Sequence, residues 1–167
     1  MNIRKAVSAD ALGIAKAHVD SWRSAYRGLV PDDRLARLDY TRGAERFRES
    51  ITREEEIIYV AENAEGIVGF LALGPCRDAG IDSATTGEVY ALYIADEYWR
   101  KGIGRVMSSE ADGILRSRGY SSVVLWVFED NERARLFYEA MGFVADGARK
   151  ILNMGAPING IRYGKTI

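Results

Sequence analysis

The chain has 167 residues, a formal net charge of −1 and one cysteine, Cys76. This length predicts one domain, residues 1–167, that buries enough apolar surface to fold without a disulfide or a metal. The near-neutral charge argues against a nucleic-acid-binding protein, and no apolar run reaches the roughly 20 residues of a membrane span. A single cysteine and a first segment that carries Asp10 and has no apolar core, unlike a signal peptide, lead us to expect a cytoplasmic protein.

The first part of the chain is predicted to form one strand and then helices. Ile3–Val7 is a short apolar-rich run of the kind found in strands. From Ala11 to Tyr26, apolar residues recur three or four apart, which predicts a helix that ends before Gly28. Pro31 begins a further short helix, and the spacing of apolar residues predicts another over Thr41–Ile51.

Beyond Glu56, strands and helices follow one another. Strand-like apolar runs cover residues 57–61, 67–73, 88–94, 123–128, 143–152 and 158–167, and helical spacing covers residues 102–117 and 131–141. The run Glu88–Ile94 is apolar on both faces, which predicts a central strand. We therefore expect an α/β fold layered around a mixed sheet.

The most informative segment joins this central strand to a helix that begins Gly102-Ile-Gly104. Because these glycines lack Cβ atoms, they leave the N–H groups of the helix's first turn open to an anion. Arg100, Lys101 and Arg105 add positive charge around the turn. The pattern predicts a phosphate or pyrophosphate site, although a tight turn with solvated basic residues would look the same.

Two other phosphate-binding motifs fit less well. The dinucleotide fingerprint needs glycine or alanine where Met107 stands, so a nucleotide-binding oxidoreductase is a distant hypothesis. Gly164-Lys-Thr166 resembles the end of a P-loop, but the upstream glycine of that motif would fall at Asn159.

The glycine turn, read as Trp99-Arg-Lys-Gly102-Ile-Gly104, resembles the acyl-CoA-binding motif of the GNAT superfamily of N-acyltransferases, (Q/R)-x-x-G-x-(G/A). Trp99 departs from the usual first residue. Further on, the segment from Asn131 through Ala134 and Tyr138 to Gly142-Phe143 is similar to the family's N-x-x-A-x-x-x-Y-x-x-x-G-F pattern. The order of the predicted elements also matches, so the resemblance covers nearly the whole chain. It implies a mostly antiparallel sheet of about seven strands, with helices on both faces and a splay between the fourth and fifth strands.

The resemblance also implies acetyl-CoA as co-substrate and no metal. Backbone groups of the splayed strand would bind the pantetheine arm and face the thioester oxygen, and amides of the glycine turn would hold the pyrophosphate. The implied cofactor-binding residues are Leu92, Tyr93, Ile94, Trp99, Arg100, Lys101, Gly102, Ile103, Gly104, Arg105, Asn131 and Phe137.

Two residues are catalytic candidates. Tyr138 matches the family's general acid, since a phenol with a pKa of about 10 can protonate a departing thiolate with a pKa of about 8.5. A packing role is the alternative for Tyr138. An amine acceptor is mostly protonated at neutral pH, so a base is expected, and Glu88 shares side-chain parity with Tyr90 and Leu92. An exposed glutamate at a strand end is the alternative for Glu88.

His18, Trp22 and Tyr26 fall on one helical stripe, which is either a wall of the acceptor pocket or part of the core. We interpret Cys76 as structural because no second thiol or histidine is near it in sequence. The sequence thus predicts an N-acetyltransferase that moves an acetyl group from acetyl-CoA to a small-molecule or peptide amine by direct attack in a ternary complex. A catalytically inactive acyl-CoA-binding module is the alternative, and exposed terminal strands favour a homodimer.

Overall fold

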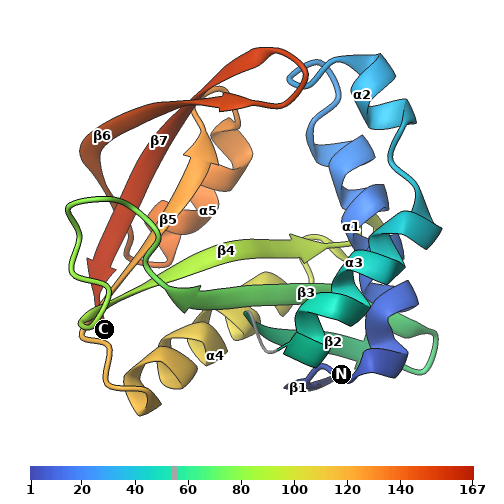
Figure 1. The fold of residues 1–167 in the computed structure, drawn as a ribbon, viewed down its shortest axis with the longest axis horizontal. Helices are drawn as coiled ribbons and strands as arrows, with labels where there is room; N and C mark the ends of the chain where they lie inside the picture. The colour runs from blue at the N-terminus through green and yellow to red at the C-terminus, as the bar shows by residue number, and fades with distance from the viewer. Residues whose placement is uncertain (54–55) are drawn as a thin grey trace.

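The computed structural model describes residues 1–53 and 56–167. Within these residues seven strands form one sheet in the order β1-β2-β3-β4-β5-β7-β6 (Figure 1). The strands are β1 (Asn2–Lys5), β2 (Ile57–Asn63), β3 (Gly66–Pro75), β4 (Thr86–Ile94), β5 (Ser122–Phe128), β6 (Val144–Asn153) and β7 (Pro157–Thr166). All neighbouring strands are antiparallel except β4 and β5, which are parallel. The predicted mixed and mostly antiparallel sheet is confirmed.

Helices cover both faces of the sheet. They are α1 (Ala11–Ala25), α2 (Asp32–Ala36), α3 (Tyr40–Arg53), α4 (Ile103–Ser117) and α5 (Glu132–Ala140), with short 3₁₀ turns η1 (Ser8–Asp10) and η2 (Asp96–Tyr98). Each predicted helix and strand is present, with bounds shifted by a few residues. None of the helices in the described ranges is both long enough and apolar enough to cross a membrane.

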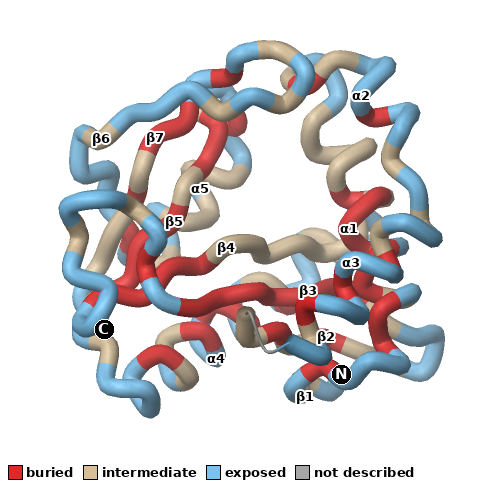
Figure 2. The backbone as a smooth tube through the Cα atoms, in the orientation of Figure 1, coloured by how far each residue is buried: buried red, intermediate tan, exposed pale blue. Residues whose placement is uncertain are grey.

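Two apolar layers hold the helices to the sheet. On one face, Ile14 of α1 and Phe47 of α3 pack with Phe70 of β3. On the other face, Met107 and Leu115 of α4 belong to a cluster with residues of β3, β4 and β5. Figure 2 shows the buried residues concentrated along β3 and β5, whereas β6 at the sheet edge is mostly exposed.

The parallel pairing of β4 with β5 is short. It runs from Thr86 opposite Ser122 to Val89 opposite Leu125 and goes no further. Beyond these pairs the two strands separate, and Figure 1 shows β5 turning away from β4. The predicted splay between the fourth and fifth strands is confirmed, and it leaves one side of the second half of β4 without a neighbouring strand.

A β-bulge changes the direction of the side chains within β4. Leu73 of β3 lies opposite Val89, but Ala72 lies opposite Ala91, so Tyr90 is an extra residue in β4. As a result, Tyr90, Ala91 and Tyr93 pack on the α1 and α3 face.

The same bulge returns Leu92 and Ile94 to the α4 face, where Val89 also packs. Glu88, next to Val89 in an unbroken part of the strand, points to the α1 face with Tyr90. The predicted parity of Glu88 with Leu92 is therefore wrong, because strict alternation along a strand fails at a bulge.

The β6–β7 hairpin reaches across to the end of α1 and to α2. Ile158 of β7 packs with Val30 and Leu35, and a Cβ on Gly155 would lie 3.4 Å from the Cβ of Arg34. Figure 1 shows the loop of the hairpin beside α2 at the top of the molecule. The β6–β7 hairpin and α2, which are far apart in the sequence, therefore lie on either side of the region where β4 and β5 separate.

The close approach of β3 and β4 predicts a position-specific effect of alanine. A Cβ at Gly69 would lie 2.7 Å from the carbonyl oxygen of Tyr93, whereas a Cβ at Gly113 in α4 has nothing within 4 Å. Gly69→Ala is expected to lower the free energy of unfolding by about 1–3 kcal/mol, because backbone atoms must move. Gly113→Ala should raise it by up to about 1 kcal/mol through helix propensity. Urea unfolding measures both changes. A Gly69→Ala protein as stable as the parent would contradict the register of β3 with β4, in which Gly69 lies opposite Ile94.

Candidate active site

The loop between β4 and α4 ends in a glycine-capped helix. Gly102 is the N-cap of α4 and has a φ of +82°. A Cβ at this position would meet no atom within 4 Å. The first N–H groups of α4 have no partner within the helix, and Gly102 has no side chain to cap them. These N–H groups are therefore open to a ligand, and the anion cradle stays a prediction.

Gly104 and Phe137 come from the two sequence motifs and meet in the fold. A Cβ on Gly104 would lie 3.3 Å from the Phe137 ring. Gly104 thus allows α4 and α5 to approach closely, in addition to the open backbone predicted for it. The contact fixes the start of α4 against α5 beside the splay.

Trp99 connects three elements of the site. Its indole Nε1 donates a hydrogen bond of 2.7 Å to the carbonyl oxygen of Ile94, the last residue of β4. The guanidinium of Arg133 on α5 lies 3.5 Å above the Trp99 ring. Arg133 was not predicted, although it precedes Phe137 by four residues and shares its helix face.

Arg100 holds an unusual backbone conformation in this loop. It is the only non-glycine residue in the described part of the chain with a positive φ, at +61°. Residues with a Cβ are disfavoured there by about 1 kcal/mol or more. The strain lies in the segment that the sequence predicts to bind a phosphate.

Asn131 is the N-cap of α5. Its side-chain oxygen accepts a hydrogen bond of 3.2 Å from the Ala134 N–H, and the residue is buried. The asparagine of the second motif therefore fixes the start of α5 at the end of β5. A contact from Asn131 to a cofactor stays a prediction.

Tyr138 lies on the face of α5 that packs against the sheet. Its ring contacts Phe143 edge-on, with 5.7 Å between ring centroids. Burial raises the pKa of the Tyr138 phenol, and the nearby Tyr93 contributes to the same shift. The phenol is neutral at neutral pH, and the raised pKa makes it a weaker acid than a solvated tyrosine, so its role as general acid stays a prediction.

An aromatic cluster fills the opposite side of the splay, and we define it as His18, Trp22, Tyr26, Tyr93 and Phe128. The hydroxyls of Tyr26 and Tyr93 are hydrogen-bonded at 2.9 Å. The Tyr26 ring also lies 4.7 Å from that of Phe128 at the end of β5. Tyr26 thus bridges the separated ends of β4 and β5, and the predicted helical stripe meets the splay.

Two members of the cluster have polar atoms in apolar surroundings. Trp22 Nε1 is buried and has no hydrogen-bond partner of normal geometry. It lies close enough to the Tyr93 hydroxyl to oppose part of the rise in the pKa of Tyr93 that burial causes. Burial, and secondarily the charge of Arg46, lower the pKa of His18 to about 4. His18 is therefore neutral at pH 7.

Glu88 is engaged in an ion pair below the splay. Its carboxylate accepts hydrogen bonds from the Arg77 backbone N–H (2.9 Å), Nε (3.2 Å) and Nη2 (2.7 Å). Only 3% of Glu88 is exposed, so the alternative of an exposed strand-end glutamate is wrong. Arg77 lies in a loop and has no sequence signal that predicts this contact. The role of Glu88 as a base stays a prediction.

Cys76 is buried, and burial raises the pKa of its thiol. A protonated thiol is a weak nucleophile, which supports the structural interpretation. In the described ranges, no group of three or more His, Cys, Asp or Glu residues could hold a metal ion.

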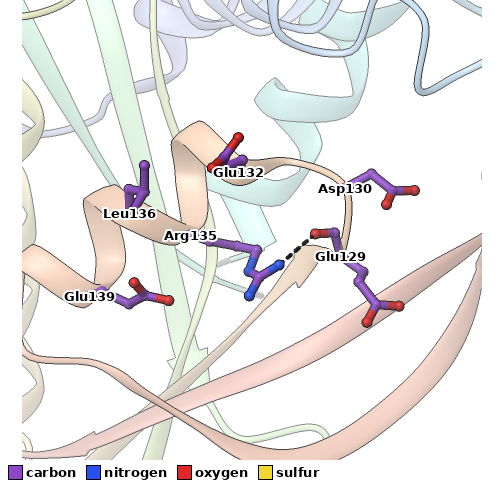
Figure 3. Close-up of a pocket in the computed structure, with 6 residues that line it drawn as sticks. All are labelled: Glu129, Asp130, Glu132, Arg135, Leu136 and Glu139. Carbon is purple, nitrogen blue, oxygen red and sulfur yellow. Dashed lines mark hydrogen bonds between the residues drawn. The ribbon is translucent and has the colours of Figure 1, made fainter.

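A separate open pocket lies along α5 and the turn before it (Figure 3). It is lined by Glu129, Asp130, Glu132, Arg135, Leu136 and Glu139. Arg135 donates to the Glu129 carbonyl at 3.1 Å, and Tyr163 donates to Glu139 at 2.7 Å. Glu129 also pairs with Arg149. These internal contacts explain why the acidic residues gather there.

Comparisons with known proteins agree with this geometry. Residues 18–143 match the model of the Acetyltransferase (GNAT) family. The uncharacterized N-acetyltransferase YuaI of Bacillus subtilis is 35% identical over 141 residues, which are 84% of this chain and 78% of that protein. A spermidine N(1)-acetyltransferase of Thermoplasma acidophilum is 25% identical over 150 residues, covering 86% of this chain and 88% of that protein.

The fold also matches solved structures. The PaiA N-acetyltransferase of Thermoplasma acidophilum, crystallised in complex with coenzyme A, superposes with a TM-score of 0.80. The two chains are 22% identical, and the match covers 99% of this chain and 98% of the other.

The strain at Arg100 predicts different effects of two substitutions. Arg100→Gly and Arg100→Ala both remove the guanidinium, but only glycine relieves the left-handed backbone. The glycine variant is expected to be more stable than the alanine variant by about 1 kcal/mol. Thermal and urea unfolding measure this difference. Equal stabilities would contradict the positive φ.

The lowered pKa of His18 predicts a pH-dependent stability. The unfolded chain takes up this proton near pH 6.5, but the folded chain does so only near pH 4. The His18 contribution to stability is therefore complete above pH 6.5 and is lost as the pH falls toward 4, by roughly 3 kcal/mol at most. His18→Phe should flatten the stability curve in this window. An unchanged slope would contradict the burial of a neutral imidazole.

Proposed function

The chain belongs to the Acetyltransferase (GNAT) family, and we propose that it transfers an acetyl group from acetyl-CoA to a primary amine by direct attack in a ternary complex. The observation that carries this proposal is the separation of β4 and β5 between two fixed groups. The glycine-capped start of α4 lies on one side, and the protonated phenol of Tyr138 lies on α5. We further propose that residues 1–167 form a single domain working in the cytoplasm, a reducing compartment that suits a chain with one cysteine.

The residues at the splay fit acetyl-CoA. The unpaired side of β4 at Leu92–Ile94 would hydrogen-bond the pantetheine arm in the manner of an added strand. The amides between Arg100 and Arg105 would hold the pyrophosphate at the positive end of the α4 dipole. Bound there, acetyl-CoA supplies the thioester. Trp99, Asn131 and Phe137 would form the remaining contacts.

Tyr138 serves in this proposal as the general acid. Its Oη donates a proton to the departing sulfur, whose thiol has a pKa of about 8.5. A phenol is protonated throughout the neutral range even at its ordinary pKa of about 10, and the raised pKa of Tyr138 makes the transfer to sulfur more uphill in this environment. A backbone N–H near Leu92 would face the developing oxyanion.

The proposed acceptor is a small-molecule or peptide amine. Glu88 is the proposed base, acting directly or through water, and its ion pair with Arg77 holds the carboxylate in one orientation. The predicted homodimer would use an edge strand, and β6 is exposed along most of its length.

Calorimetry with coenzyme A tests the proposed cofactor. We expect binding heat and a raised melting temperature, because the splay and the α4 N-terminus are preformed. A Gly104 variant with a bulky residue should bind more weakly, since its side chain would push Phe137 and α4 apart. No heat and no thermal shift at millimolar coenzyme A would contradict the proposal.

Replacement of Tyr138 by phenylalanine tests the general acid. The rate of thiol release from acetyl-CoA with a panel of amines should fall by roughly 100-fold or more. Tyr120→Phe is the matched control, because Tyr120 precedes β5 at the end far from the splay and should leave the rate unchanged. A Tyr138→Phe rate within a factor of two of the parent across the pH range would show that another group donates the proton.

A further inference from the structure

The aromatic cluster lies on the α1 side of the splay. Tyr26 touches Tyr93 of β4 and Phe128 of β5, opposite the α5 face that carries Tyr138. The surrounding wall is apolar. It is formed from α2, the segments on either side of it and the β6–β7 hairpin by Val30, Leu35, Leu38, Leu152, Met154 and Ile158.

Four carboxylates on the elements around this region accept hydrogen bonds, two of them from arginines and two from neutral hydroxyl groups. Glu88 is paired with Arg77, and Asp78 is paired with Arg162 at 3.0 Å and accepts from Trp126 Nε1 at 2.8 Å. Asp96 accepts a hydrogen bond of 2.7 Å from Ser24. On α1, Asp20 accepts a hydrogen bond of 2.7 Å from Tyr40.

The groups of the cluster itself carry no negative charge. Burial raises the pKa of Tyr26, Tyr93 and Tyr138, so all three phenols are neutral. His18 is neutral as well. Within the described ranges, no carboxylate is among the groups that shift the pKa of His18, Tyr93 or Tyr138.

The formal charge beside the cluster is positive. Arg133 forms no ion pair with any residue that the structure describes and stacks on Trp99. Partial burial is the largest cause of the lowered pKa of Arg133. Tyr26 opposes it, the neighbouring charge of Arg100 acts in the same direction as burial, and Asp96 has the smallest, raising effect. A second cation brought to this region would be repelled.

An ammonium group is therefore poorly accommodated at the splay. It would lose its hydration among aromatic rings close to the positive charge of Arg133, and cation–π contact with the rings would offset only part of that loss, so the charged form is disfavoured relative to the neutral amine. The neutral amine loses much less hydration free energy on transfer, and its N–H groups can donate hydrogen bonds to the hydroxyl oxygens of Tyr26 and Tyr93. A site of this kind favours amines whose ammonium form has a low pKa, because a larger fraction of such an amine is neutral in water.

From this electrostatic arrangement we propose that the acceptor is a weakly basic primary amine, such as an α-amino group, bound uncharged at the aromatic cluster. The inference rests on the proposed acetyl transfer. It excludes alkylammonium groups of the lysine or polyamine type as preferred acceptors. The nitrogen lone pair forms the bond to the acyl carbon, and the C–S bond breaks. Sulfur takes the Tyr138 proton, and the proton lost by nitrogen passes to the proposed base Glu88. Glu88 then releases that proton to solvent, and the Tyr138 phenolate takes one up from solvent, so both groups are restored.

Two isomers of acetylated lysinamide test the inference. Nε-acetyl-L-lysinamide offers only an α-amine, whereas Nα-acetyl-L-lysinamide offers only an ε-amine. At about pH 7.5, roughly a third of an α-amine with a pKa near 7.8 is neutral, against about one in 1,000 for an ε-amine with a pKa near 10.4. We therefore expect kcat/KM for thiol release to favour the α-amine isomer by roughly 100-fold or more.

The pH profile gives a second readout. The rate with the ε-amine isomer should rise about tenfold per pH unit up to about pH 10, whereas the rate with the α-amine isomer should level off above about pH 8. Equal or better use of the ε-amine isomer, or of spermidine, at pH 7.5 would overturn the inference.

A charge reversal at Arg133 tests the electrostatic cause. Arg133→Glu places a carboxylate beside the cluster and should shift the ratio of the two isomers at least tenfold toward the ε-amine. Arg116→Glu is the matched control, because it makes the same charge reversal at an exposed residue in the last turn of α4, at the other end of that helix from the glycine turn, and should leave the ratio unchanged. An unshifted ratio in Arg133→Glu would contradict the role of this charge.

Failure of the inference differs from failure of the proposed function. If coenzyme A gives no binding heat and no amine releases thiol, acetyl transfer itself is wrong. If coenzyme A binds and spermidine or the ε-amine isomer is used equally well, only the assignment of a weakly basic acceptor is wrong. If coenzyme A binds and neither isomer is acetylated, the α-amine assignment is overturned.

Discussion

The site depends on the point at which β4 and β5 stop pairing. Four parallel pairs, ending at Val89 and Leu125, hold the two strands together, and beyond them the strands separate. An interrupted ladder leaves backbone donors and acceptors of β4 unpaired, and such groups are stabilised by an extended ligand that replaces the missing strand. The start of α4, the N-cap of α5 and the end of α1 all meet at this separation.

The bulge at Tyr90 gives the two faces of the separated strand different functions. One extra residue turns Tyr93 toward α1 and returns Leu92 to the face of α4 and α5. One short segment therefore supplies backbone near the glycine turn and an aromatic hydroxyl on the opposite face. Without the bulge, Tyr93 would point to the other face and could not pair with Tyr26.

Charge is distributed around the site by pairing. Glu88 and Asp78, which could have made the acceptor side acidic, are held by Arg77 and Arg162. Arg133 and Arg100 remain near the glycine turn, where positive charge favours a phosphate. The near-zero net charge of the chain conceals this local asymmetry between a cationic loop and an uncharged aromatic cluster.

Local patterns in the sequence determined much of this protein. The strands and helices followed from apolar periodicity, and Gly102, Gly104 and Tyr138 were found because each belongs to a motif of fixed spacing within a single segment. The tertiary structure alone decided the rest. The ion pair of Glu88 with Arg77, the stacking of Arg133 on Trp99 and the pairing of Tyr26 with Tyr93 join residues from separate elements. Such contacts depend on strand register, a bulge and helix packing, which are set by long-range burial and leave no periodic trace in the sequence.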